Sequence, residues 1–250
     1  MSLFSFQGKL HTAIRQANGK PGVLTWMGNA PSCQLKLSTE TSKKTESFSG
    51  NRLQYGELQK GKTAELSITL DEWTPANIAM ALYATQIATI AGTVTGELLP
   101  AGLLAGNTVR LDRAFVSNLV LTDSAGTPAT VAADKYSLSS PNAGLVDLLD
   151  VGTFVQPFKA AYSYAATDSF TMLTAAPPER FLLLDGIDTE TNEPVLVELW
   201  RCKFAPVGQL DLIVDDYGNL PLTGSVLYDP INAKNANLGG FGRITHKKAV

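Results

Sequence analysis

An adjacent acid pair, Asp215 and Asp216, is the first feature of this 250-residue chain whose residue types could do chemistry. Two neighbouring carboxylates can share a proton as a catalytic dyad or bind one cation together. On a strand, however, adjacent side chains point to opposite faces, so this pair could do neither without a bend. The surrounding DDYGN is rich in turn residues. We therefore predict a bend between two strands, residues 210–214 and 220–227, rather than an active site.

A second acidic segment, DGIDTETNE at residues 185–193, has the composition of a calcium-binding loop. It lacks the twelve-residue order of ligands with a central glycine and a closing bidentate glutamate. The segment lies between two apolar runs, FLLL and VLVELW. This arrangement favours a hairpin with an acidic turn, and a calcium site is the alternative.

Nucleophilic, metal-dependent and phosphate chemistry each require a characteristic set of residues. The chain has only two histidines, His11 and His246, and two cysteines, Cys33 and Cys202. It contains no G-x-S-x-G, C-x-x-C, H-E-x-x-H or G-x-x-x-x-G-K-[ST] pattern. We therefore predict that the protein is not an enzyme and has no catalytic residue, no metal site and no cofactor. Two distant cysteines without a secretory segment are typical of free thiols in a reducing compartment.

Charge is sparse in this chain. Charged residues make up 17% and the net charge is -3, whereas soluble domains usually contain about 25% charged residues. Such a composition fits a subunit covered by its neighbours, and it equally fits an ordinary β-rich domain. A sequence-independent DNA-binding protein would carry a basic patch. Here the basic residues are scattered, so we expect no DNA binding, and no segment is typical of a membrane span.

Alternating apolar residues predict strands along most of the chain. The run CQLKLSTE alternates, and in TAELSITLDEW the residues Ala64, Leu66, Ile68 and Leu70 share one face. Between these runs lies a polar segment, residues 39–61, which we expect to be a long hairpin loop, either functional or disordered. Further strands are predicted in TVRLDRAFVSNLVLTD, in DKYSLSSPNAGLVDLL, in PFKAAYSYAA and in the C-terminal third.

One helix is predicted, over residues 76–84. Thr74 is a suitable N-cap, and Pro75 occupies the first helical position. Ile78, Leu82 and Tyr83 form the expected packing face, at helical spacing. We expect this helix to flank or plug a β core. No change in composition divides the chain, so we predict a single domain over residues 1–250 with a short C-terminal arm at residues 232–250.

The order of these features resembles that of the major tail tube proteins of long-tailed, non-contractile bacteriophages. The resemblance rests on the N-terminal strand and polar loop in GNAPSCQLKLSTETSKKTESFSGNR, and on the strand and helix in TAELSITLDEWTPANIAMALYAT. It continues through DKYSLSSPNAGLVDLL and VQPFKAAYSYAA. The last and most specific part begins at FLLLDGIDTETNEPVLVELWRCKFAP and ends at SVLYD.

The resemblance implies a mainly β fold, a β-sandwich or barrel-like tail tube domain with one flanking α-helix. It implies a structural virion protein, located in the tail and assembled in the host cytoplasm. Copies would form hexameric rings that stack into a hollow tube, with the tape-measure protein and the tail-tip and terminator proteins as further partners. DNA would pass through the lumen without specific binding. The long loop would contact the neighbouring ring through Thr41, Ser42, Lys43, Lys44, Thr45, Glu46, Ser47 and Phe48.

A different class of function also agrees with a β-rich chain. A monomeric β-barrel module that binds a small ligand would have the same strand patterns and the same lack of catalytic motifs. The two hypotheses differ in oligomeric state, because the tail tube subunit must polymerise and the ligand-binding module need not.

Overall fold

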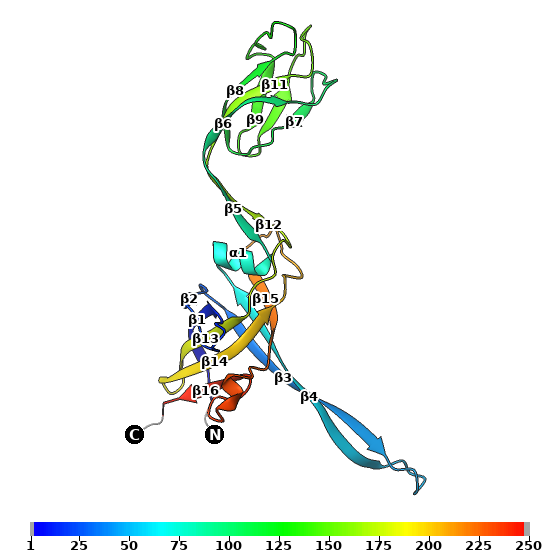
Figure 1. The fold of residues 1–250 in the computed structure, drawn as a ribbon, viewed down its shortest axis with the longest axis vertical. Helices are drawn as coiled ribbons and strands as arrows, with labels where there is room; N and C mark the ends of the chain where they lie inside the picture. The colour runs from blue at the N-terminus through cyan, green and yellow to red at the C-terminus, as the bar shows by residue number, and fades with distance from the viewer. Residues whose placement is uncertain (1–2, 248–250) are drawn as a thin grey trace. The chain divides into compact units, whose positions relative to one another are not determined.

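The computed structural model describes residues 3–247, and the chain divides into two compact units. Unit 1 contains the residues up to 86 and from 170 onward, and unit 2 contains residues 87–169 (Figure 1). The composition of the chain predicted one domain, whereas the structure has two units, because each buries a hydrophobic cluster of its own with no residue common to both.

Unit 1 is built on one antiparallel sheet with the strand order β2-β1-β13-β14-β15-β4-β3, and β16 pairs with part of β14. The prediction of a mainly β fold with one α-helix is confirmed, but the sheet does not close into a barrel within the described residues. The strands are β1 (Phe6–Ile14), β2 (Thr25–Trp26), β3 (Ser32–Thr45), β4 (Gln54–Leu70), β13 (Arg180–Asp188), β14 (Glu193–Phe204), β15 (Leu220–Val226) and β16 (Gly242–His246).

The core of unit 1 follows the predicted alternation in β4. Ala64, Leu66, Ile68 and Leu70 are all buried, and the residues between them are exposed or half-buried. They pack in one cluster with residues of β14 and β15, among them Phe204. Alternate residues of β4 therefore form one buried face along the part of the strand that contributes to this core.

The helix α1 (Pro75–Ala81) begins as predicted. The Thr74 side chain accepts a hydrogen bond from the Asn77 backbone N–H at 3.2 Å, and Pro75 is at the first helical position. The helix ends earlier than predicted, because Tyr83 adopts a left-handed φ of 50° that no helix can continue through. No helix within residues 3–247 is both long and apolar enough to span a membrane.

Unit 2 has two three-stranded antiparallel sheets around its own core. The predicted strand-turn-strand in DKYSLSSPNAGLVDLL is present as β9 and β10. The chain passes between the units within β5 and β12, which pair with each other. The strands are β5 (Thr85–Thr89), β6 (Gly92–Leu98), β7 (Thr108–Arg110), β8 (Val116–Thr122), β9 (Tyr136–Ser140), β10 (Leu145–Leu148), β11 (Lys159–Tyr164) and β12 (Thr167–Thr171).

The expected long loop at residues 39–61 is largely strand. β3 continues to Thr45 and β4 starts at Gln54, so the connection is only residues 46–53. The pairing stays in antiparallel register from Ser32 and Thr69 outward to Thr45 and Gln54, with two irregularities. Backbone hydrogen bonds form a ladder whatever the side chains are. The polar composition therefore reflects a ribbon without a core beneath it, not the absence of strands.

Two expectations near the C-terminus are also corrected. Residues 210–214 are not a strand: β14 ends at Phe204, and residues 205–219 form an irregular loop before β15. The expected arm at residues 232–250 contains a 3-10 helix η1 (Asn232–Lys234) and β16, which adds to the sheet beside residues 195–199. This tail has no apolar alternation of its own, and part of it forms a strand because it pairs with a free edge of β14. Residues 248–250 of that expected arm lie outside the described residues.

Candidate assembly interface

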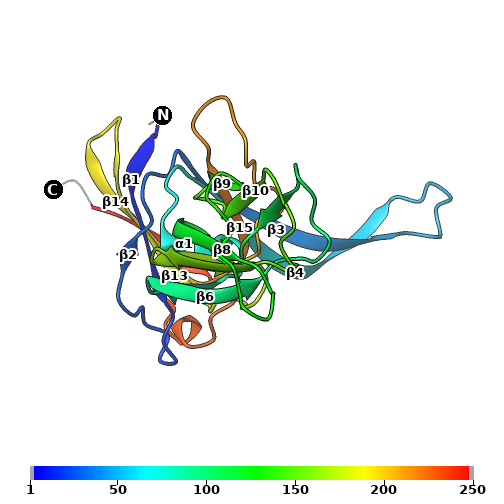
Figure 2. The ribbon, with the colours of Figure 1, turned by 90° about the horizontal axis from the view of Figure 1, so that it is seen from above.

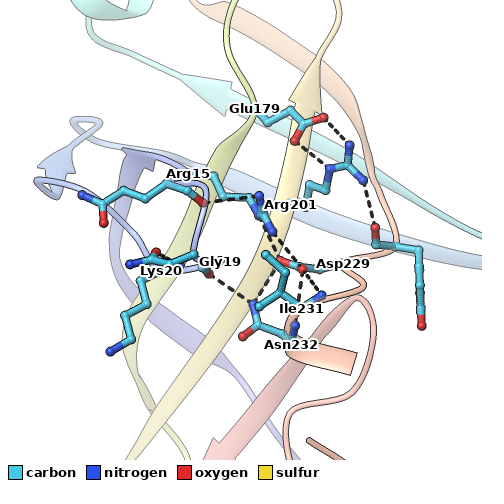
Figure 3. Close-up of polar contacts among 11 residues, drawn as sticks. Arg15, Gly19, Lys20, Glu179, Arg201, Asp229, Ile231 and Asn232 are labelled. Carbon is cyan, nitrogen blue, oxygen red and sulfur yellow. Dashed lines mark hydrogen bonds and ion pairs between the residues drawn. The ribbon is translucent and has the colours of Figure 1, made fainter. Parts of the chain in front are cut away.

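The densest group of paired charges in unit 1 ties its N-terminal and C-terminal segments together (Figure 3). Arg15 donates from Nε and Nη2 to the two carboxylate oxygens of Asp229, both at 2.9 Å. Asp229 is fully buried and also accepts the backbone N–H of Ile231 at 2.9 Å. Burial disfavours its ionised form, but these donors outweigh burial and hold the pKa of Asp229 below its ordinary value. A carboxylate so fully paired has a structural role.

Arg201 and Glu179 form a second bidentate pair beside the first, with both nitrogen-to-oxygen distances at 2.6 Å. Arg201 also donates to the backbone carbonyl of Tyr228 at 3.1 Å. This pair lowers the pKa of Glu179 through its hydrogen bonds. Neither cluster leaves an unpaired carboxylate that could serve as a general base.

The acidic segments predicted as turns do not gather ligands for a metal ion. In the described part of the chain, no three His, Cys, Asp or Glu side chains lie close enough together to hold one. Asp188 accepts the backbone N–H groups of Ser5 and Glu190, both at 3.1 Å, as a turn residue does. Asp215 and Asp216 are both exposed in the loop 205–219.

The histidines and cysteines do not form a catalytic group either. His11 lies in β1, and His246 lies in β16, with its ring 6.0 Å from that of Phe6. Both cysteines are free thiols, and burial raises the pKa of Cys202 to about 12. A thiol with that pKa is protonated at neutral pH and is a poor nucleophile.

The most unusual feature of unit 1 is a two-stranded ribbon that extends away from the sheet. We call residues 38–63, the outer parts of β3 and β4 with their turn, the arm. Both views show the ribbon projecting from the rest of unit 1 (Figure 1 and Figure 2). Residues 51–60 are all exposed, so the outer part of β4 covers nothing on either face. An isolated two-stranded hairpin is marginally stable in water, and this one therefore calls for a partner surface.

The side chains of the arm combine apolar groups with positive charge. Phe48, Leu53, Tyr55 and Leu58 are each 61–80% exposed. Burying one such side chain is worth about 1.5–3 kcal/mol. The arm holds five basic and three acidic residues, a net charge of +2 in a chain whose net charge is -3. The basic residues are Lys43, Lys44, Arg52, Lys60 and Lys62.

The tip of the arm is closed by one carboxylate. Glu46 is only 7% exposed and accepts hydrogen bonds from the backbone N–H groups of Phe48 and Ser49, both at 2.8 Å. It also accepts from Leu53 N–H at 3.3 Å and from the Ser49 hydroxyl. The hydrogen bonds from Ser49, first of all that of its hydroxyl, lower the pKa of Glu46 to about 2. The turn is thereby held in one shape, with the Phe48 ring outside it.

At the other end of unit 1, three segments contain no basic residue, and two of them contain acidic residues. They are residues 71–84, 170–178 and 205–219, which we call the acidic end. The last segment lines one hollow with residues 71–73 and another with residues 81–82 and 172–173. The acidic residues are Asp71, Glu72, Asp211, Asp215 and Asp216.

The acidic end also exposes large apolar side chains. Leu212, Ile213 and Tyr217 are 84%, 93% and 96% exposed, and residues 211–219 are exposed without interruption. Trp73 is 55% exposed and lines a hollow with Asp211 and Gly218 of the same loop. Below Leu212 lies an apolar groove of about 310 Å³ whose walls include Leu82 and Leu173. Contiguous exposed apolar residues of this kind mark interaction surfaces.

The arm tip and the acidic end lie at opposite ends of one strand. β4 runs over 17 residues from Gln54, next to the tip, to Leu70, next to Asp71. At about 3.3 Å per residue the strand is on the order of 50 Å long. The ribbon drawing agrees, with α1 and the tip at the two ends of unit 1 (Figure 1). The two surfaces therefore cannot meet within one copy.

Comparison with known proteins yields one family model, which matches residues 3–245. The chain belongs to this family. Its description is "Protein of unknown function UCP028589", so membership by itself assigns no activity. No curated protein matches the chain.

The structure divides the residues that the sequence analysis named as one loop. Thr41, Ser42, Lys43, Lys44 and Thr45 lie in β3, whereas Glu46, Ser47 and Phe48 lie in the turn. The helix residues also differ among themselves. Ile78 is buried, whereas Leu82 and Tyr83 lie just past the end of α1 and are half-buried. The Tyr83 hydroxyl donates to the Phe204 carbonyl at 2.7 Å.

The sequence patterns did not indicate half of the candidate interface. They did not single out Tyr55 and Leu58 on the β4 side of the arm, nor Trp73, Leu212 and Ile213 at the acidic end. A usable signal was present, because the three segments of the acidic end lack any Lys, Arg or His. Only the fold brings these segments together.

Proposed function

We propose that the protein is a structural virion protein, the tail tube subunit of a long-tailed bacteriophage. Its copies form hexameric rings, and the rings stack into the hollow tube through which the genome leaves. The observation that carries this proposal is the arm, a ribbon of exposed apolar and basic side chains that has no partner surface among the described residues. A projection of this kind stabilises an assembly and not a monomer.

The open sheet of unit 1 supports the same proposal. β3 ends the strand order, and its outer edge pairs with no strand of the described chain. A free edge of 14 residues invites pairing with another chain unless it is covered. Contacts between neighbouring subunits in a ring supply that cover, while the arm contacts the next ring.

The sparse charge agrees with this function as well. A subunit with several covered faces needs few charged residues, and this chain has 17%. The resemblance of the sequence to tail tube proteins supplies the remaining partners: the tape-measure protein, the tail-tip and terminator proteins, and DNA that passes without specific binding. The competing hypothesis, a barrel enclosing a small ligand, is not supported by a main sheet that stays open within the described residues.

Negative-stain microscopy of the purified protein tests the proposal. Wild-type protein at high concentration is expected to form rings and tubes. In the matched variant, Asn-Gly replaces residues 42–58 and joins Thr41 to Gln59, which are register partners in the ribbon. We expect this variant to keep its circular dichroism spectrum and to lose stacking.

A full-length chain carrying Lys20→Ala and Asp134→Ala, two exposed positions outside the arm, is the control, and it is expected to assemble as wild type does. A wild-type sample that stays monomeric at high concentration and binds a small apolar ligand saturably would contradict the proposal and favour the ligand-binding module.

A further inference from the structure

We propose that the arm of one copy docks on the acidic end of a second copy. This inference rests on the proposed self-assembly and deepens it, because it names the surface that receives the arm. The acceptor surface consists of the loop 205–219, the junction at residues 71–73 and the groove beside Leu82 and Leu173.

Charge is the first argument for this pairing. The arm offers five basic residues, and the acidic end offers five carboxylates with no basic residue among them. Opposite potentials on two surfaces steer encounter and exclude other partners. Lys43 and Lys44, on the β3 side of the tip, are both exposed and form no ion pair within the described residues.

Apolar complementarity is the second argument. Phe48 and Tyr55 lie edge to face at the tip, with ring centroids 6.1 Å apart, and present one aromatic group to a partner. The acidic end presents Leu212 on the wall of an apolar groove of about 310 Å³, and Trp73 on the wall of a second hollow. Aromatic anchors that fill such grooves contribute most of the binding energy at protein interfaces.

Geometry makes the contact head to tail. The donor and acceptor surfaces differ, and they lie at opposite ends of a strand that is on the order of 50 Å long. When two copies join through these two unlike surfaces, the pair still has one free arm and one free acidic end. It therefore repeats along an axis, which is how heterologous interfaces build open polymers.

Another apolar groove on unit 1 is a poorer acceptor. It lies between β3 and β16 and is lined by Leu37, Ile244 and Arg243. Its charges are already paired within the chain, because Arg243 binds Glu198. It thus offers no net negative charge to the basic arm.

A charge swap tests the docking. Lys43→Glu with Lys44→Glu, and separately Asp215→Lys with Asp216→Lys, are each expected to slow assembly at low salt at least tenfold by light scattering. Assembly is expected to recover to within about threefold of wild type when a chain carries all four changes. The control, Lys20→Glu with Asp134→Lys, reverses exposed charges outside both surfaces and is expected to assemble as wild type does.

Disulfide trapping gives an independent readout. In a Cys33→Ser background, one protein carries Tyr55→Cys and another carries Ile213→Cys. Mixing the two under mild oxidation is expected to give a crosslinked heterodimer. That heterodimer is absent when Ile213→Cys is replaced by Asp134→Cys.

The outcomes separate the two proposals. The docking would be overturned if the variant with Asp215→Lys and Asp216→Lys forms tubes as well as wild type does and no heterodimer is trapped. The proposed tube function would be unaffected by that result. The heterodimer without rings or tubes supports the docking and counts against the tube. Absence of both assembly and heterodimer overturns the two together.

Discussion

Arg15 and Asp229, 214 positions apart, form a buried bidentate ion pair with both nitrogen-to-oxygen distances at 2.9 Å. The pair fixes the end of β1 to the segment that follows β15, and so holds both chain ends on the sheet that carries the arm. The Arg15 side chain is 11% exposed and the Asp229 side chain is 0% exposed. Removing one member leaves an uncompensated buried charge.

We expect Arg15→Ala to lower the free energy of unfolding by about 3–5 kcal/mol. Urea denaturation followed by tryptophan fluorescence measures this change. The control is Lys36→Ala, which breaks an exposed ion pair with Glu65 and is expected to cost at most about 1 kcal/mol. Equal losses in the two variants would contradict a structural role for Arg15.

The turn at the tip of the arm is expected to depend on pH through Glu46. Its pKa is about 2 in the folded chain against an ordinary value of 4.5. A lowered pKa means that the ionised form stabilises the turn above pH 4.5, and that this contribution is lost as pH falls toward 2. The amide signals of Phe48 and Ser49 in an NMR titration are expected to shift over that range. Glu46→Gln removes the dependence, and an unchanged titration in this variant would be evidence against the assignment.

Tyr83 is expected to join the end of α1 to β14 through its hydroxyl, which donates to the Phe204 carbonyl at 2.7 Å. Tyr83→Phe removes that donor and retains the ring. A hydrogen bond of this kind contributes about 0.5–1.5 kcal/mol. Thermal unfolding is the measurement, with Tyr55→Phe as the control, because the Tyr55 side chain is 70% exposed. Equal unfolding temperatures for the two variants would count against the contact.

Unit 2 is expected to fold without unit 1, because its twelve buried core residues all lie within residues 87–169. Residues 87–169 expressed alone should unfold cooperatively in a thermal melt.

The reciprocal protein joins Thr89 to Thr167 by Asn-Gly. The Ser169 hydroxyl donates to the Ile87 carbonyl, so these two strands already lie side by side. The reciprocal protein is expected to keep the core of unit 1 and the ion pair between Arg15 and Asp229. A non-cooperative melt of either protein would show that the units depend on each other.

Local patterns in the sequence were sufficient for several elements. The alternation of Ala64, Leu66, Ile68 and Leu70 predicted a strand with one covered face, and all four are buried. Thr74 and Pro75 predicted the start of α1. Each of these features follows from groups a few residues apart, whose chemistry acts the same way in any fold.

Other features depended on contacts between distant segments, and only the tertiary structure decided them. The polar run at residues 39–61 became strand because its backbone groups pair across the ribbon. The apolar run at residues 210–214 became part of an irregular loop, because it pairs with no strand of the described chain. The tail supplied β16 because β14 had a free edge. The candidate interface belongs to the same class, since the acidic end joins three segments that are distributed between residues 71 and 219. The sequence by itself determined the β class, the helix start and the residues with apolar alternation. The partners of each strand, and the surfaces left without a partner, required the whole chain to fold.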